Sequence, residues 1–523
     1  MNGEAVAVRS AGRWLFLFIL SVCMATTGGH LYTGDGIEMY RTAESLALRG
    51  SLALTPDVDG RIWGYQGPDG RRYSPYALGL SVIEAPLLLA GKAAASLLPL
   101  PELARLQLTW AVVMTANAFV TAATGALLFF LASTLGYGVR AAATVALLLS
   151  LGTMAWVYSK HDFAEPLAGL CLLGAVYFIV RAGASGSSGL LALAGVFNGY
   201  GFFTKYQMVL YTPILLGLLV AMAPRRERRA AGLLPRFASF LAPGLLFGLA
   251  NLVVNHARFG SWFQTGYGNQ GEIFAGLGFL PAGLFGLLLS TGKGLLWFSP
   301  ILLAVPFAWR EFHRRDRRMS LLCGSISGVA IFMFAPLWWW HGDWAWGPRY
   351  LVIALPFLVL PLAAWFDDPG RLTFRVFGPV RLRHVLAGLL LAALAVNALG
   401  LSVNFVYYLQ ALRGLDQVHD DWNYIPNLSP IRFHTHVVLA NLGMMAGAPP
   451  GDFRYQYWCD GVLEEKTVAW DSYPEGGRDF DYFFFRPRDT GREQIALGLA
   501  GLMMLGAAAY CARRLRVVLG AAS

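Results

Sequence analysis

VLAGLLLAALAVNALGLSVNFVYYL, residues 385–409, contains no Asp, Glu, Lys or Arg. A helix of about 20 apolar residues crosses the hydrocarbon core of a bilayer, and similar uncharged runs stand at 141–158 and 350–366. Only 14% of the 523 residues are charged and 56% are hydrophobic, whereas soluble domains carry about 25% charged residues. The sequence therefore predicts an all-α polytopic membrane protein rather than a soluble enzyme.

Arginines gather in short stretches between apolar runs, at 225–236, 310–318 and 371–383. Short basic loops are typical of the cytoplasmic side of a membrane. The long polar segment 410–493 has 8 basic and 13 acidic residues, a net charge of 8 − 13 = −5. The formal net charge of +10 is thus confined to membrane-flanking loops, which argues against nucleic acid as a partner and favours anionic membrane lipids.

Placing every arginine cluster inside predicts about twelve transmembrane helices with both termini cytoplasmic, in a bacterial inner membrane. The predicted spans are 14–31, 106–132, 141–158, 165–182, 189–204, 207–223, 237–256, 294–309, 319–337, 350–366, 385–409 and 494–511. The first span also resembles a signal peptide with small residues for cleavage at 25–29, but we favour an uncleaved helix.

Segment 76–98 is long enough to cross, but counting it would place all later arginine clusters outside. With Glu84, Pro86 and Lys92, it fits a helix in the outer interface better.

The same orientation divides the chain into three regions. Residues 1–409 form a transmembrane domain with the outer loop 32–105, residues 410–493 an outer-face segment, and residues 494–523 a last helix with a basic tail. Strand-like runs such as YFFFRP at 482–487 predict a small α/β unit or a lid in the second region. His434 and His436 would share one face of a strand there, and without a third local ligand they predict no metal site.

Ionisable residues collect where predicted spans meet the outer face. Asp35 follows the first span and precedes a helical pattern at 37–48, so it is either a helix cap or a general base near the lipid surface. Lys205, Lys293 and Arg349 either neutralise an anionic leaving group or extend towards lipid headgroups. Most tryptophans of 338–346 fit an interfacial belt, while Trp346, next to Gly347 and close to Arg349, is our candidate for facing a substrate.

Several motifs in order along the chain carry a family resemblance. They are RRYSPYALGLSVIEAPLL (71–88), HDFAEPLAGLCLLGAVYF (161–178), GVFNGYGFFTKYQMVLYTPILL (195–216), NHARFGSWFQTGYG (255–268), LLLSTGKGLLWFSP (287–300) and WWWHGDWAWGPRYLVIALPFLVLPLA (338–363). Together they resemble the GT-C superfamily of membrane glycosyltransferases. The most similar branch uses polyprenyl-phosphate sugars and includes the protein O-mannosyltransferases and the aminoarabinose transferase of lipid A.

The resemblance implies a hexosyl- or pentosyltransferase of the cell envelope that inverts the anomeric carbon. Asp35 would act on the acceptor, and Glu165 is the better match to the family's second acidic site, with Asp162 as its rival. The implied donor-phosphate residues are Lys205, Arg349, Lys293 and Arg72, and the implied substrate-binding residues are Trp346, Tyr267, His161 and Asp162. Arg72 departs from the pattern, because this chain reads Arg-Tyr-Ser-Pro where relatives carry Lys-Pro-Pro.

The resemblance leaves the cofactor and the acceptor open. Some GT-C enzymes use a divalent cation, so the resemblance allows Mg or Mn between Asp35 and Glu165. The acceptor would be a glycan, a lipid or a protein. A flippase or transporter of lipid-linked saccharides is the alternative, but it would place ionisable residues near the bilayer midplane. A Wzy-like polymerase, which relies on arginines in two large outer loops, is the third alternative.

Overall fold

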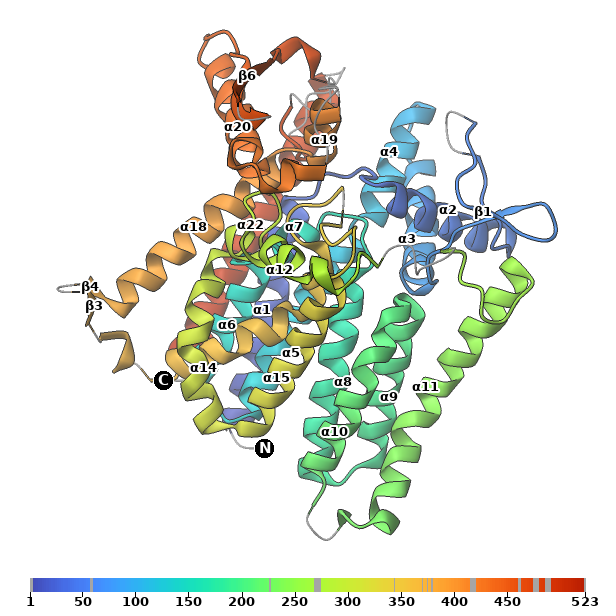
Figure 1. Cartoon of the computed structure of the whole chain (residues 1–523), viewed down its shortest axis with the longest axis vertical. Helices are drawn as coiled ribbons and strands as arrows, with labels where there is room; N and C mark the ends of the chain where they lie inside the picture. The colour runs from blue at the N-terminus through green and yellow to red at the C-terminus, as the bar shows by residue number, and fades with distance from the viewer. Residues whose placement is uncertain are drawn as a thin grey trace.

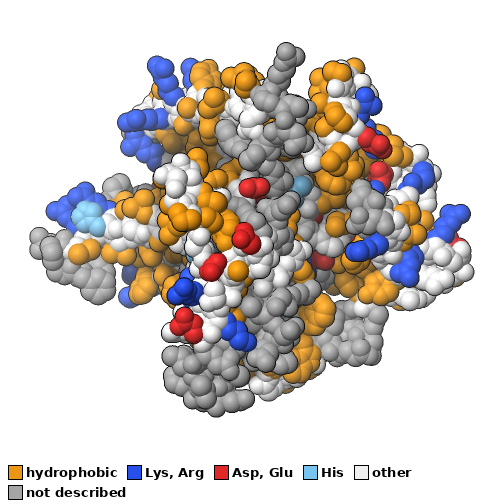
Figure 2. Space-filling model, turned by 90° about the horizontal axis from the view of Figure 1, so that it is seen from above, with side chains coloured by type: hydrophobic (Ala, Val, Ile, Leu, Met, Phe, Trp, Pro, Cys, Tyr) orange, Lys and Arg blue, Asp and Glu red, His pale blue; other side chains and the backbone are white. Residues whose placement is uncertain are grey.

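The computed structural model describes residues 3–56, 60–224, 227–267, 274–342, 344–368, 370–373, 375–377, 380–413, 420–459, 462–473, 479–484 and 491–521. It is a bundle of helices with both termini toward one end and the segments 34–96 and 405–445 at the other (Figure 1). Seen from that second end, the surface carries acidic and basic side chains among apolar ones (Figure 2).

The described elements are mostly helical. In chain order the α-helices are α1 (Gly3–Ala25), α2 (Gly34–Arg49), α3 (Gly79–Ser96), α4 (Glu102–Val113), α5 (Ala116–Thr134), α6 (Val139–Leu151), α7 (Ala155–Tyr158), α8 (Glu165–Ser185), α9 (Ser188–Thr204), α10 (Thr212–Met222), α11 (Ala230–Phe259), α12 (Leu280–Leu289), α13 (Leu295–Phe298), α14 (Val305–Arg315), α15 (Arg317–Phe334), α16 (Leu355–Val359), α17 (Ala363–Phe366), α18 (Leu382–Ser402), α19 (Phe405–Arg413), α20 (Pro430–Met445) and α22 (Gly491–Ala521). Three antiparallel strand pairs join β1 (Tyr65–Gln66) to β2 (Arg72–Tyr73), β3 (Arg375–Phe377) to β4 (Val380–Arg381), and β5 (Phe453–Cys459) to β6 (Val462–Val468).

Eight helical stretches among the described residues are long and apolar enough to cross a membrane. They are Ala5–Ala25, Glu102–Thr134, Glu165–Ser185, Ala231–Phe259, Arg317–Phe334, Arg349–Phe366, Leu382–Ser402 and Gln494–Ala521. The other predicted spans are helical too, but they are shorter or interrupted. The predicted span 294–309, for example, is divided into α13, a 3-10 turn at Pro300–Ala304 and α14, because the prolines at 300 and 306 cannot donate a backbone hydrogen bond inside a helix.

Close helix contacts fix the part of the bundle that positions the site. Helix α9 packs between α8 and α11. A Cβ atom at Gly195 of α9 would lie 2.0 Å from the backbone oxygen of Phe240 in α11, so only glycine allows this approach. Small residues commonly let transmembrane helices meet in this way. The start of α8 and the end of α9 are consequently held side by side.

Helices α2, α3 and α4 pack together at the end of the molecule remote from the termini (Figure 1). Helix α3 lies within the segment 76–98 and is not among the eight candidate spans. Its Glu84 is buried, with 1% of its surface exposed. Its predicted place in the membrane interface stays a prediction.

The terminal segment combines helices α19 and α20 with the hairpin β5–β6, in which Phe453 pairs with Val468. The prediction that His434 and His436 lie on a strand is wrong, because both are in α20. Pro430 stands in the first turn of α20, where its missing N–H costs nothing, and the spacing of buried Phe433 and Val437 is helical. Of the run predicted as a strand at 482–487, residues 482–484 have no strand structure and residues 485–487 lie outside the described residues.

Candidate active site

A small pocket is formed by the first turn of α2, the start of α8 and the end of α9. Its lining includes four of the predicted site residues: Asp35, Glu165, Lys205 and Tyr267. The other lining residues are Met39, Tyr76, Ala77, Phe163, Ala164, Thr204 and Tyr206. Residues from five distant stretches of the chain therefore converge here.

Asp35 occupies the first turn of α2. It is not the cap of this helix, because Thr33 takes that role and its hydroxyl oxygen accepts a hydrogen bond from the backbone N–H of Gly36 at 3.0 Å. The Asp35 carboxylate is instead directed to other partners. Oδ1 accepts a hydrogen bond from the Tyr76 hydroxyl at 2.7 Å, and Oδ2 accepts one from Nη1 of Arg349 at 2.8 Å.

These partners set the charge of Asp35. Burial raises the pKa of this carboxyl, but the guanidinium of Arg349 and the hydroxyl of Tyr76 lower it by more, so its pKa lies below the ordinary value. Burial and the negative charge of Asp35 in turn raise the pKa of Tyr76 well above the usual range. Tyr76 therefore stays a hydrogen-bond donor to an ionised Asp35 at neutral pH.

The second carboxylate of the pocket has its own cation. Glu165 begins α8, and its Oε1 lies 2.5 Å from Nζ of Lys205 at the end of α9. The Glu165 side chain is 1% exposed, while that of Lys205 is 18% exposed. Nζ of Lys205 also lies 5.9 Å from the centre of the Tyr350 ring. The pocket lining thus contains both members of one ion pair, Glu165 with Lys205, and one member of a second, because Asp35 lines the pocket while Arg349 contacts it from outside the lining.

Asp162, the predicted rival of Glu165, has a different place. Its carboxylate accepts hydrogen bonds from the backbone N–H groups of Tyr32 and Thr33 at 2.8 and 3.2 Å, and from the Thr33 hydroxyl at 3.1 Å. Burial raises the pKa of Asp162 to about 6 in spite of these hydrogen bonds. Asp162 holds the chain just before Asp35 and is 1% exposed.

The remaining predicted residues are not brought to the pocket lining. Trp346 is 1% exposed and packs against Phe298, Phe405 and His434. Lys293 is fully buried, and its ammonium group donates to the carbonyl of Ala345 and lies 4.6 Å from the centre of the Phe405 ring.

Two further predicted residues also lie elsewhere. Arg72 is exposed in the β1–β2 hairpin, where it donates to the carbonyl of Gly64. His161 is buried between Tyr32 and Phe163.

Two residues near the site were missed by the sequence reasoning. Arg258, which stands in the quoted Arg-Phe-Gly motif, is 1% exposed and donates to the carbonyls of Ser74 and Tyr76 and to the hydroxyl of Tyr206. It therefore holds two of the residues that line the pocket. Glu38 lies one turn after Asp35, and burial raises its pKa to about 7, with a further contribution from the charge of Asp35. The spacing of Asp35 and Glu38 on a predicted helix was the available signal.

The donor set of the pocket does not fit a divalent cation. Such a site needs carboxylate oxygens that converge on one point, but both oxygens of Asp35 accept hydrogen bonds from Tyr76 and Arg349, and Glu165 is paired with Lys205. Each carboxylate already has a positive partner. Within the described residues no group of three or more His, Cys, Asp or Glu side chains is placed to hold a metal ion.

No protein-family model matches this sequence, and no curated protein matches it. Among solved structures, the oligosaccharyltransferase of Archaeoglobus fulgidus in the apo form gives a TM-score of 0.51 at 12% identity over 80% of this chain and 58% of that one. ArnT from Cupriavidus metallidurans in the apo state gives a TM-score of 0.45 at 14% identity, covering 97% of this chain and 76% of ArnT. The structure of ArnT bound to undecaprenyl phosphate gives 0.45 at 15% identity, covering 85% and 73%.

The likeness to the oligosaccharyltransferase shows that this chain shares the fold of that protein. It is a multi-pass membrane protein. The resemblance predicted from the motifs is confirmed at the level of the fold.

Proposed function

We propose that this protein is a glycosyltransferase that moves a sugar from a polyprenyl-phosphate-linked donor to a hydroxyl group of an acceptor. The observation that carries the proposal is a pocket whose lining contains the Glu165–Lys205 ion pair and the carboxylate of Asp35, which pairs with Arg349 beside the pocket. Transfer of this class needs a group that receives the hydroxyl proton and positive charge beside the departing phosphate. Both kinds of group stand in one small space, on a fold that serves such enzymes.

In the proposed reaction the acceptor oxygen attacks the anomeric carbon from the side opposite the phosphate. The new C–O bond forms as the bond to the phosphate oxygen breaks, and the configuration at the anomeric carbon inverts. The hydroxyl proton passes to Asp35, which is ionised at neutral pH because its pKa is lowered. Lys205 and Arg349 neutralise the negative charge that develops on the polyprenyl phosphate.

The proposal assigns Glu165 to placing Lys205 rather than to proton transfer. Glu165 is almost fully buried and Lys205 is partly exposed, so the carboxylate holds the ammonium group at the pocket wall, where a ligand meets it. Tyr76 and Tyr267 line the same wall, with ring centres 5.7 Å apart and nearly perpendicular ring planes. Aromatic and hydroxyl groups of this kind suit a sugar ring with its polar edge.

We further propose that the pocket faces the outer side of a bacterial inner membrane. In support, α2 and the start of α8, which carry Asp35 and Glu165, lie away from the termini in Figure 1, whereas α14, which ends at Arg315, lies on the side of the termini. A polyprenyl-phosphate donor places its phosphate at the level of the lipid headgroups. Where a described residue of a candidate membrane span forms a salt bridge, it lies at or near the end of that span, as Glu165, Arg236 and Arg349 do. This favours an enzyme over a transporter with midplane charges.

The experiment compares purified wild-type protein with Asp35→Asn in detergent, supplied with a polyprenyl-phosphate sugar and candidate acceptors. General-base assistance contributes about 10²- to 10⁴-fold, so donor consumption by the variant is expected to fall at least about 100-fold. The matched control is Asp69→Asn, which changes a carboxylate of the same outer loop that is 43% exposed and lies outside the pocket lining.

Two outcomes would overturn the proposal. If wild-type protein consumed no donor with any acceptor but moved lipid-linked sugar across vesicles, the protein would be a transporter. If Asp35→Asn kept full transferase activity, Asp35 would not be the base.

A further inference from the structure

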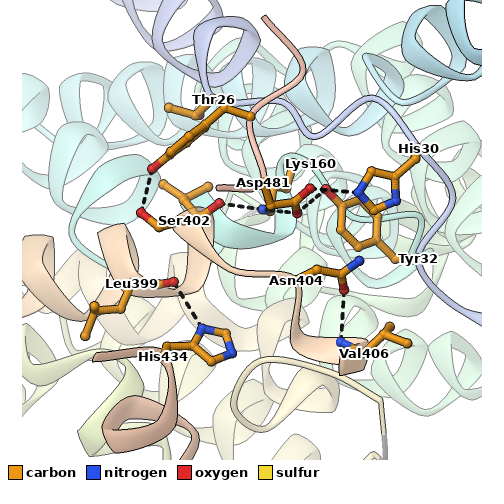
Figure 3. Close-up of polar contacts among 12 residues, drawn as sticks. Thr26, His30, Tyr32, Lys160, Leu399, Ser402, Asn404, Val406, His434 and Asp481 are labelled. Carbon is orange, nitrogen blue, oxygen red and sulfur yellow. Dashed lines mark hydrogen bonds and ion pairs between the residues drawn. The ribbon is translucent and has the colours of Figure 1, made fainter. Parts of the chain in front are cut away.

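A second group of buried polar residues is centred on Asp481 of the terminal segment, outside the pocket lining (Figure 3). Nζ of Lys160 lies 2.7 Å from Oδ2 of Asp481, and neither side chain has exposed surface. The Tyr32 hydroxyl donates to the same oxygen at 2.9 Å, and Nε2 of His30 lies 2.7 Å from Oδ1. One carboxylate thus joins the terminal segment to the loop before α2 and the loop before α8.

The backbone around Asp481 is attached to the bundle as well. Its N–H donates to the carbonyl of Ser402 at the end of α18, at 2.9 Å, and two residues later the N–H of Phe483 donates to the carbonyl of Thr27 at 2.8 Å. A Cβ atom at Gly28 would lie 1.7 Å from the Tyr32 hydroxyl. Gly29 has a φ of +69°, and a Cβ there would lie 2.3 Å from the ring of Phe483. The glycine pair is therefore required for this contact.

Asp481 is connected to the pocket through very few residues. Tyr32 contacts Asp481 through its hydroxyl and Asp162 through its backbone N–H. The next residue, Thr33, caps α2, and Asp35 stands in the first turn of that helix. The tripeptide 160–162 holds both sides of this connection, because Lys160 pairs with Asp481 while Asp162 binds the backbone of 32–33.

The charges in this group depend on one another. A buried ammonium group without a partner is strongly destabilising, whereas removing both members of a buried pair together costs much less. Burial raises the pKa of Asp481, but Lys160 and His30 lower it by more, so it lies well below the ordinary range and the carboxylate is ionised. The contact between the terminal segment and the α1–α2 connection is therefore a charged one.

We propose that Asp481 is a positioning residue for Asp35: through Tyr32 it fixes the connection between α1 and α2, so that the docked terminal segment sets the direction of the Asp35 carboxylate. The contacts that attach Tyr32 and the α1–α2 connection to Asp481 are called the clamp below. The effect of the clamp on catalysis rests on the proposed function, whereas the existence of the clamp does not. The terminal segment is then part of the active-site framework.

The clamp is tested first without any measurement of activity. Gly34, which is exposed and has no atom within 4 Å of the position that a Cβ would take, is replaced by Cys and carries a nitroxide spin label. Cys459 is replaced by Ser in all samples, and the other four cysteines are buried. The electron paramagnetic resonance line shape of the label is compared in otherwise unchanged protein, Tyr32→Phe, Asp481→Asn and the control Asp479→Asn, which removes a half-buried carboxylate two residues away.

We expect a narrower, more mobile spectrum for Asp481→Asn and an intermediate one for Tyr32→Phe, and no change for Asp479→Asn. Tyr32→Phe deletes a single hydroxyl group and keeps the Lys160–Asp481 pair, so it remains informative if Asp481→Asn does not fold. An unchanged line shape in Tyr32→Phe together with an unchanged one in folded Asp481→Asn would overturn the proposal. If Asp481→Asn does not fold, an unchanged line shape in Tyr32→Phe alone overturns it.

The catalytic consequence is read from kinetics without the spin label. Because a misplacement of about 1 Å costs up to about 100-fold, we expect Tyr32→Phe to lower kcat about ten-fold with an unchanged KM for the donor. Equal kcat values in Tyr32→Phe and wild type would refute the positioning role even if the spin label became mobile. A wild-type protein without transferase activity would refute the proposed function, and the line-shape comparison would still decide the clamp.

Discussion

Replacing Arg349 by Met tests the central ion pair of the pocket. Methionine has a long flexible side chain without charge. In the native protein Nη1 of Arg349 donates to Asp35 at 2.8 Å, and the guanidinium lies 4.9 Å from the centre of the Phe163 ring and 5.1 Å from that of Tyr350. The substitution removes a charged hydrogen bond and two contacts with aromatic rings at a side chain that is 13% exposed.

The size of the effect follows from these contacts. A hydrogen bond to a charged group contributes about 1.5–3 kcal/mol, and a partly buried cation–π contact about 0.5–1 kcal/mol. With two such contacts the sum is about 2.5–5 kcal/mol, and each 1.4 kcal/mol is about a factor of ten. If these contacts act in the transition state, kcat/KM for the donor is expected to fall about 60- to 4,000-fold.

The pH dependence should change in a defined direction. Arg349 is the chief group that lowers the pKa of Asp35, and burial, which raises it, remains in the variant. The ionised form of Asp35 exists above its pKa, so activity is lost as pH falls through that pKa. In wild type this loss is expected below the ordinary value of 3.8, and in Arg349→Met it moves to higher pH.

The assay measures kcat/KM with a radiolabelled polyprenyl-phosphate sugar from about pH 3 to about pH 8, a range that begins below the ordinary pKa of an aspartic acid, about 3.9. The control is Arg72→Met, which removes an exposed arginine of the β1–β2 hairpin outside the pocket lining. A loss of equal size in both variants would show that net charge matters rather than the ion pair. Full activity of Arg349→Met with an unchanged acidic limb would refute the assignment of Arg349.

Three further predictions concern neighbouring groups. Burial raises the pKa of Glu38 from 4.5 to about 7, so the contribution of this residue to stability is complete below pH 4.5 and is lost as pH rises to about 7. At about pH 8, Glu38→Gln should therefore have a higher Tm than wild type, with a gain of at most about 3 kcal/mol in the free energy of unfolding. An equal gain at about pH 4 would contradict this prediction. Gly36→Ala places a Cβ 1.9 Å from the Asp162 carboxyl group, so kcat should fall about ten-fold or more. Steady-state kinetics would detect this loss. The control Gly34→Ala, whose Cβ would meet open space, should leave kcat unchanged. Because the donor set does not fit a divalent cation, EDTA should leave the rate unchanged, and a loss restored by Mg²⁺ or Mn²⁺ would contradict our interpretation.

The sequence predicted the helical membrane fold and the convergence of several site residues. Asp35, Glu165, Lys205 and Tyr267 line one pocket, and Arg349 contacts Asp35 from a position 314 residues away. These positions could be predicted because each stands at the end of an apolar run, and helix ends on the same side of a membrane meet at one level. The number of spans could not be fixed in the same way, because proline and 3-10 turns divide several apolar runs into short helices.

Side-chain direction was beyond reach of the sequence. Trp346 follows the aromatic pattern of the outer rim, yet its ring is buried against Phe298 and His434, because burial of an aromatic residue is decided by packing between distant segments. Lys160 and Asp481 were missed for a related reason. They are 321 residues apart, and no local spacing connects a lysine at the end of one apolar run with an aspartate in a polar segment.

The two ion pairs of the pocket imply an order of events in the proposed reaction. The phosphate of a donor and the carboxylates of Asp35 and Glu165 compete for the same two cations, Arg349 and Lys205. When the phosphate accepts hydrogen bonds from the guanidinium of Arg349, the interaction of Arg349 with Asp35 weakens. This interaction lowers the pKa of Asp35 more than any other does, while burial continues to raise that pKa. Asp35 then becomes a stronger base only after the donor has bound. Proton transfer from the acceptor hydroxyl is thereby coupled to the presence of the leaving group, through charge alone.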